Sequence, residues 1–63
     1  MNKEEAIKAM QEGKKVTHQY FAPGEWMTMK DGKIVLEDGV VCSPEEFWHW
    51  RNTPGWDKGY MLF

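Results

Sequence analysis

Cys42 is the single cysteine in a chain of 63 residues, so no internal disulfide can hold this fold together. A chain of this length forms one domain, residues 1–63, and buries only about 60% of the surface that its unfolded form exposes. Its stability must therefore come from large side chains or from self-association. Four Trp, two Tyr and three Phe supply such side chains, since each aromatic buries about 150–250 Å². One small core cannot easily hide four indoles, so we expect some of them to lie at a functional surface or in a homo-oligomer interface.

The charge distribution argues against nucleic acid as a partner. The formal net charge is −2, and between Ile34 and Trp50 there are four acidic residues but no Lys or Arg, whereas nucleic-acid-binding domains usually carry a basic patch. The charged N-terminal residues lead into no apolar run of the kind found in secretory signals. No run approaches the roughly 20 apolar residues of a membrane span. With a single thiol as well, we expect a cytoplasmic protein that binds neither nucleic acid nor membrane.

The first 13 residues carry the signals of a short helix. Asn2 can cap its start and Glu5 follows three residues later, which is the spacing of a capping box. Gly13 is placed to end the helix in a left-handed conformation. We therefore predict a helix over residues 3–12, with an apolar face made by Ala6, Ile7 and Met10.

The middle of the chain predicts an antiparallel meander. Alternating apolar and polar residues predict strands over residues 14–20, 25–30, 33–37 and 40–42. The break at Ala22-Pro23-Gly24 predicts the first turn. Asp31-Gly32 and Asp38-Gly39 each predict a type I′ hairpin turn. A final edge strand is expected at residues 60–63, whose free apolar edge would invite pairing.

Ser43 and Glu46 form a second capping-box pattern, with Pro44 in the first turn, and predict a helix over about residues 44–51. At 3.6 residues per turn, Phe47, Trp50 and Arg51 share one side of this helix. Trp48 projects about a quarter-turn away. We therefore expect the helix to anchor the core and to present Trp48. The predicted fold is α+β: an N-terminal helix packed on a meander of four to five strands, with a short second helix before the last strand.

Six side chains are candidates for binding a ligand or partner: His18, Tyr20, Trp26, Trp48, Arg51 and Trp56. His18 is interpreted either as a half-buried residue bonded across the sheet or as a polar contact at a pocket mouth. Arg51 either pairs with Glu25 or Asp57, or receives a phosphate or carboxylate. The indoles are either core residues or a stacking and interface surface.

The sequence shows no catalytic constellation, and we expect a protein that is not an enzyme, with no metal site and no cofactor. Glu45 and Glu46 match helix-start electrostatics better than an acid pair. Cys42 precedes a helix N-terminus, where a thiolate is favoured. We nevertheless interpret it as a small buried side chain and not as a nucleophile.

The opening of the chain resembles a group of small phage and prophage proteins. The matching residues are Glu5-Ala6-Ile7 in the first helix, the run Gly13-Lys14-Lys15-Val16 leading into a strand, and the aromatic Trp26. Together they cover about the first third of the chain. The best-known members of the group are the Thoeris anti-defence sponges, which sequester a cyclic ADP-ribose signal without degrading it and assemble as oligomers. The resemblance implies a phage-type binding protein that inhibits host defence.

Two hypotheses follow from the sequence. The first is a non-catalytic homo-oligomeric protein that holds a nucleotide-like small molecule or a segment of a host protein. The second is a structural or interaction module whose aromatics form only the core and a dimer interface.

Overall fold

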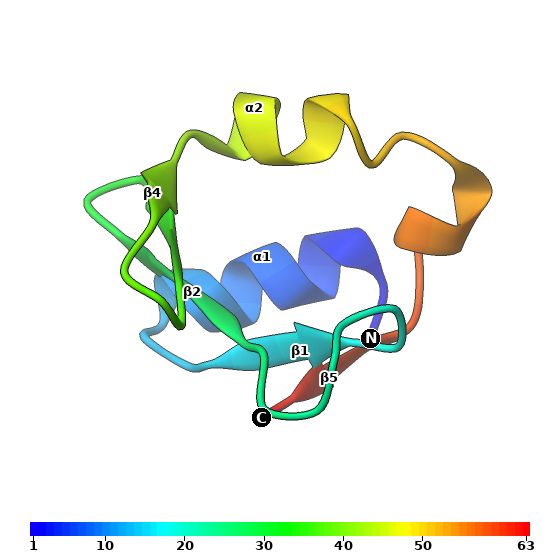
Figure 1. Cartoon of the computed structure of the whole chain (residues 1–63), viewed down its shortest axis with the longest axis horizontal. Helices are drawn as coiled ribbons and strands as arrows, with labels where there is room; N and C mark the ends of the chain where they lie inside the picture. The colour runs from blue at the N-terminus through cyan, green and yellow to red at the C-terminus, as the bar shows by residue number, and fades with distance from the viewer.

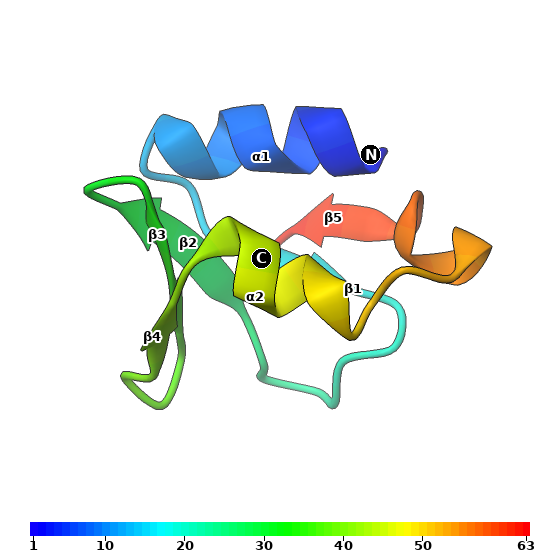
Figure 2. The same ribbon diagram turned by 90° about the horizontal axis from the view of Figure 1, so that it is seen from above.

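The computed structural model describes all 63 residues as an α+β fold with five antiparallel strands in one sheet (Figures 1 and 2). The strands are β1 (Val16–His18), β2 (Met27–Lys30), β3 (Lys33–Leu36), β4 (Val41–Cys42) and β5 (Tyr60–Leu62), in the spatial order β4-β3-β2-β1-β5. The first four form the predicted meander. The last strand returns past the others to pair with β1 in antiparallel register.

The helix α1 (Lys3–Gln11) begins and ends where the sequence predicts, within one residue. The Asn2 side chain accepts a hydrogen bond from the Glu5 N–H, and the Glu5 carboxylate accepts one from the Asn2 N–H. Gly13, which follows the C-cap, has a φ of 87°. The buried face of α1 consists of Ala6, Ala9 and Met10, while Ile7 is only half-buried.

The two Asp-Gly turns differ. Asp31 and Gly32 both have positive φ, 53° and 76°, which confirms the type I′ turn between β2 and β3. Asp38 has no positive φ, so the prediction of a second type I′ turn is wrong. The Leu36 N–H bonds to the Val40 carbonyl around a three-residue loop, and the Asp38 carboxylate accepts the Val40 N–H. A three-residue hairpin needs positive φ only at its last position, which is supplied by Gly39.

The strand predicted over residues 14–20 is shorter in the structure, because the chain leaves the sheet after His18. The Tyr20 N–H donates to His18 Nδ1 at 3.0 Å, and the Phe21 N–H donates to the His18 carbonyl. These bonds replace a strand ladder with a turn. Tyr20 therefore leaves the buried face that alternation assigns to it and is 59% exposed.

The second helix, α2 (Pro44–His49), has the predicted capping box between Ser43 and Glu46. Its orientation reverses the prediction for the two indoles: Trp48 is 7% exposed and Trp50 is 82% exposed. The side that faces the core centres on positions 47, 48 and 51, and at about 100° per residue Trp50 lies roughly twice as far from that centre as Trp48. The helix also ends at His49, which leaves Trp50 as its C-cap.

Both helices cover the same face of the sheet, and one core cluster joins them to it. Residues that are paired across two strands point to the same face of the sheet. The pairs that place the buried strand residues on the helix-covered face are Val16 with Met27, His18 with Tyr60, and Ile34 with Met29. The opposite face of the sheet is not covered by a helix: in Figure 1 no helix lies beyond β1 and β5 on the side away from α2. The nine buried apolar residues are Ala6, Ala9, Met10, Val16, Met27, Ile34, Phe47, Trp48 and Tyr60.

Strand β5 is an edge strand, but part of its edge is already paired. The Phe63 N–H donates to the Lys15 carbonyl, and the Gln19 N–H donates to the Gly59 carbonyl. Because backbone groups alternate in direction along an antiparallel strand, the N–H and C=O groups of Tyr60 and Leu62 point away from β1. The backbone of Met1 bonds to both outward groups of Tyr60. Only Leu62 within β5 is left to offer a free backbone pair.

We expect Tyr60→Phe to lower the free energy of unfolding by about 1–3 kcal/mol, since the Tyr60 hydroxyl accepts from Trp48 Nε1 at 2.9 Å and donates to the Trp56 carbonyl. Burial raises the pKa of this hydroxyl, with the Trp48 hydrogen bond opposing. The stabilisation is therefore present below pH about 10 and is lost as the pH rises through the folded-state pKa. Urea denaturation of both proteins should show the stability gap at neutral pH and its narrowing under alkaline conditions. A constant gap would contradict this account.

Candidate functional site

His18 is the only buried polar side chain, at 2% exposure, and all of its ring nitrogens are satisfied. Because Nδ1 accepts the Tyr20 N–H, the ring proton belongs on Nε2, which lies 2.7 Å from the Lys58 carbonyl and 3.2 Å from the Gly55 carbonyl. Of the two interpretations, the structure supports a buried histidine, although its partners lie in the 55–58 segment instead of across the sheet. His18 thus fixes the loop that follows α2.

Trp56 lies in the 3-10 helix η1 (Pro54–Trp56) and stacks on the His18 ring, with centroids 4.2 Å apart. Tyr20 lies edge-on to Trp56 at 5.2 Å. The hydroxyl end of the Tyr20 ring also lies against Gly55, where an added Cβ would clash with the Tyr20 hydroxyl. The absence of a side chain at Gly55 therefore allows the exposed tyrosine ring to sit beside the half-buried indole.

Trp48 is part of the core and does not present its ring to solvent. Its Nε1–H donates to the Tyr60 hydroxyl, and its ring lies edge-on to Phe47 at 5.0 Å. Tyr60 in turn lies edge-on to His18 at 4.5 Å. Trp48 is therefore connected to the His18 and Trp56 cluster through Tyr60, as a supporting residue beneath that cluster.

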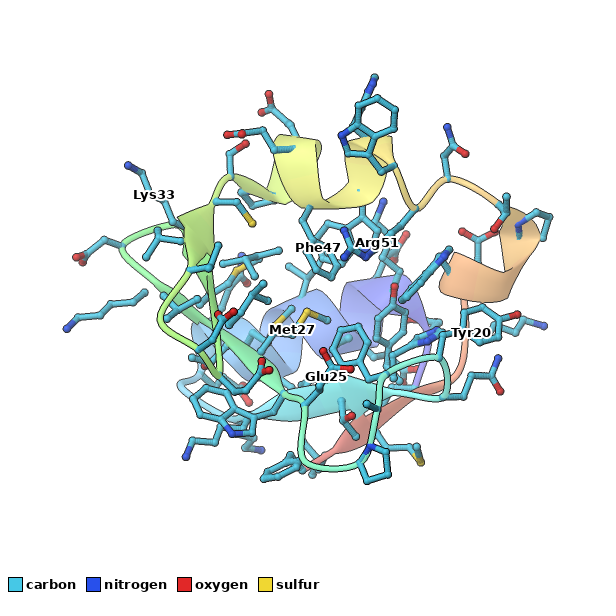
Figure 3. All side chains as sticks on the ribbon, viewed as in Figure 1. Tyr20, Glu25, Met27, Lys33, Phe47 and Arg51 are labelled. Atoms are coloured by element: carbon cyan, nitrogen blue, oxygen red, sulfur yellow. The ribbon has the colours of Figure 1, made fainter.

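Arg51 points from the end of α2 toward the interior beside Phe47, as Figure 3 shows. Its Nη1 donates to the Phe47 carbonyl at 2.9 Å, and its guanidinium carbon lies 4.0 Å from the Phe47 ring centroid and 5.5 Å from that of Trp56. Arg51 forms no ion pair with a carboxylate. The single ion pair of the chain joins Lys14 and Glu12. Of the two alternatives for Arg51, the pairing with Glu25 or Asp57 does not occur. The Glu25 carboxylate is used locally and accepts the Ala22 N–H.

Trp26 lies apart from the other five candidates. It precedes Met27 on β2, so alternation places it on the uncovered face of the sheet. There its ring lies 6.3 Å from that of Phe63, with the Lys15 ammonium 4.3 Å above its centroid. Five of the six predicted residues thus gather around Trp56 and Tyr60, and only Tyr20, Trp56 and Arg51 of these reach solvent.

The structure also exposes apolar residues outside the six candidates: Trp50, whose exposure the sequence did not predict, and the C-terminal residues, where an apolar edge was expected. Trp50 is the most exposed large apolar residue, and Met61, Leu62 and Phe63 at the C-terminus are each more than half exposed. The helical spacing of Trp50 assigned it to the buried side of α2. Only its position beyond Trp48 near the breakers at residues 52–55 could have signalled exposure.

The surface has three shallow hollows, of about 260, 290 and 350 Å³. They lie beside α1 and the β2–β3 turn, along α2, and near residues 2–4 and 57–58, respectively. None is lined by the six candidate residues. The Tyr20, Arg51 and Trp56 surface is therefore an open one.

No group of three or more His, Cys, Asp or Glu side chains is arranged to hold a metal ion. Neither helix has the length and apolar character needed to cross a membrane. Comparison of the chain with protein-family models, curated proteins and solved structures gives no match.

Cys42 is a free, half-buried thiol on the edge strand β4. Burial and the nearby charge of Glu46 raise its pKa, with Arg51 opposing. The thiolate is therefore scarcer than in an unhindered cysteine. We expect iodoacetamide to alkylate the native protein more slowly than the urea-unfolded chain at mildly alkaline pH. An equal or faster rate in the native protein would show that the thiol is activated.

Proposed function

We propose that this chain is a small non-catalytic binding protein that holds an anionic, ring-bearing molecule, such as a nucleotide, on the surface formed by Tyr20, Arg51 and Trp56. The observation that carries the proposal is a guanidinium without a carboxylate partner near the half-buried Trp56 ring, which in turn lies beside the exposed Tyr20 ring. A planar cation and stacking rings are complementary to phosphate and base, respectively.

Arg51 is held in place while most of its donors stay free. A guanidinium carries five N–H donors, and the single hydrogen bond of Arg51 runs from Nη1 to the Phe47 carbonyl. That bond and the Phe47 ring beneath the guanidinium fix its plane. A phosphate can therefore be received by the remaining donors with little loss of side-chain freedom, which favours a bidentate contact.

The rings are supported from below by the buried part of the cluster. His18 stacks on Trp56 and bonds to the carbonyls of Gly55 and Lys58, so the loop that carries the indole is fixed on both sides of it. Pre-placed rings lose little conformational entropy on stacking with a ligand. His18 and Trp48 are thus positioning residues in this proposal, while Tyr20 supplies a side of the ligand surface.

The resemblance of residues 5–16 to Thoeris anti-defence sponges supports a more specific role. In this role a phage or prophage protein sequesters a nucleotide-like signal in the host cytoplasm and thereby inhibits host defence. A homo-oligomer would suit an open surface, because a second copy can enclose a ligand that one subunit covers on only one side.

The test is calorimetric titration with cyclic ADP-ribose, ADP-ribose and adenosine. We expect the two phosphate-containing molecules to bind and adenosine to bind at least about tenfold more weakly, a difference of about 1.4 kcal/mol. Arg51→Lys keeps the charge but removes the planar fork and should weaken binding about as much. Tyr20→Leu should also weaken it. Lys33→Gln, in the β2–β3 hairpin, is the matched control and should have no effect. Absence of binding heat for all three molecules would overturn the proposal.

The exposed C-terminal side chains favour a second candidate, an interaction module that forms a dimer. Met61, Leu62 and Phe63 are 51%, 57% and 60% exposed on one edge of the sheet. Apolar side chains grouped in this way often mark a subunit interface.

Light scattering over a wide range of concentration tests this candidate. A dimer that dissociates in Leu62→Lys, together with silent titrations, would identify the interaction module. A monomer whose mass does not change with concentration would exclude it. Lys8→Gln on the exposed side of α1 is the control and should leave the mass unchanged.

A further inference from the structure

Three of the four indoles have a cation from the same chain above the ring. The Lys3 ammonium lies 4.8 Å from the Trp48 ring centroid, the Lys15 ammonium lies 4.3 Å from that of Trp26, and the Arg51 guanidinium lies 5.5 Å from that of Trp56. Trp50 has none. It is also the most exposed of the four, at 82%. The fold therefore leaves a single indole face without the contact that the others make.

The surroundings of Trp50 hold its ring at the edge of a hollow. The His49 ring lies edge-on to it, with centroids 4.7 Å apart and an interplanar angle of 88°. Glu45, Glu46, His49 and Trp50 line a hollow of about 290 Å³ along the outer side of α2. In Figure 1, α2 lies at the periphery of the molecule, so no other element covers this side.

The charge beside Trp50 is negative and is not neutralised within the chain. The Glu46 carboxylate is occupied by the capping box with Ser43, whereas Glu45 has no hydrogen bond or ion pair. No Lys or Arg occurs between Ile34 and Trp50. Glu45 and Trp50 line the same hollow, so a cation bound in it has both the indole and a free carboxylate beside it.

We propose that the outer side of α2 is a docking surface for an arginine or lysine side chain carried by a segment of a partner protein. The cation would lie against the Trp50 ring, with Glu45 as its charged partner and His49 limiting the rotation of the indole. Cation–π contact and an adjacent carboxylate together recognise a charged side chain, and neither favours a neutral one. This surface is separate from Tyr20, Arg51 and Trp56, so the inference does not depend on the proposed nucleotide binding.

The probe is an acetylated, amidated tetra-arginine peptide, and tetra-citrulline is its neutral isostere. The indole N–H resonance of Trp50 in NMR spectra, assigned by its loss in Trp50→Leu, reports the binding. We expect the resonance to shift with tetra-arginine and to stay fixed with tetra-citrulline. Because Trp50 is exposed, Trp50→Leu should fold normally, with an unchanged circular dichroism spectrum, and should lose binding detected by calorimetry.

Charge variants separate a defined site from diffuse attraction. Glu45→Gln should weaken tetra-arginine binding severalfold, while Glu4→Gln, an acid at the start of α1, should leave it unchanged. Equal weakening by both would overturn the proposal, as would undiminished binding by Trp50→Leu or equal binding of tetra-citrulline. A Trp50 resonance that moves with protein concentration alone would show that a second copy occupies the surface, which also overturns it.

Discussion

The hydroxyl of Tyr60 connects the three parts of this small fold. It accepts the indole N–H of Trp48 from α2 and donates to the carbonyl of Trp56 in η1, while the residue itself lies in β5. Its ring is fully buried and lies against His18. With only nine buried apolar residues in the core, a polar link of this kind supplies a specific geometry that apolar contacts alone do not give. The surface at Tyr20, Arg51 and Trp56 is built on this link.

The sequence predicts the fold well because the helix starts and a hairpin turn are determined by residues that are close together in the chain. The capping boxes at Asn2 and Ser43 and the turn at Asp31-Gly32 act over three or four residues and occur as expected. The fold class, the element order and the helix before the last strand are therefore confirmed. The departures occur where longer-range bonds decide the conformation. The Tyr20 N–H donates to His18 Nδ1 and not to a neighbouring strand. The His18 ring is held in position for this bond because its Nε2 bonds to carbonyls 37 and 40 residues away.

The candidate site is less predictable because side-chain exposure depends on how elements pack. Helical spacing cannot tell whether Phe47 shares the buried side of α2 with Trp48 or with Trp50, since both are compatible with an amphipathic turn. The choice depends on Tyr60, which offers the Trp48 indole a hydrogen-bond acceptor inside the core. Trp26 is a residue type that is common in binding sites, but strand alternation places it on the face of the sheet opposite to the helices, away from the other candidates.

The pairing of Met1 with Tyr60 brings the two ends of the chain together across a sequence separation of 59 residues. Residues 1–60 must therefore all be present before the edge of the sheet and the centre of the core can form. A meander that folds without β5 would leave His18 and the indole of Trp48 without their shared neighbour Tyr60. We expect these residues to fold in one cooperative step once Tyr60 is available, instead of element by element.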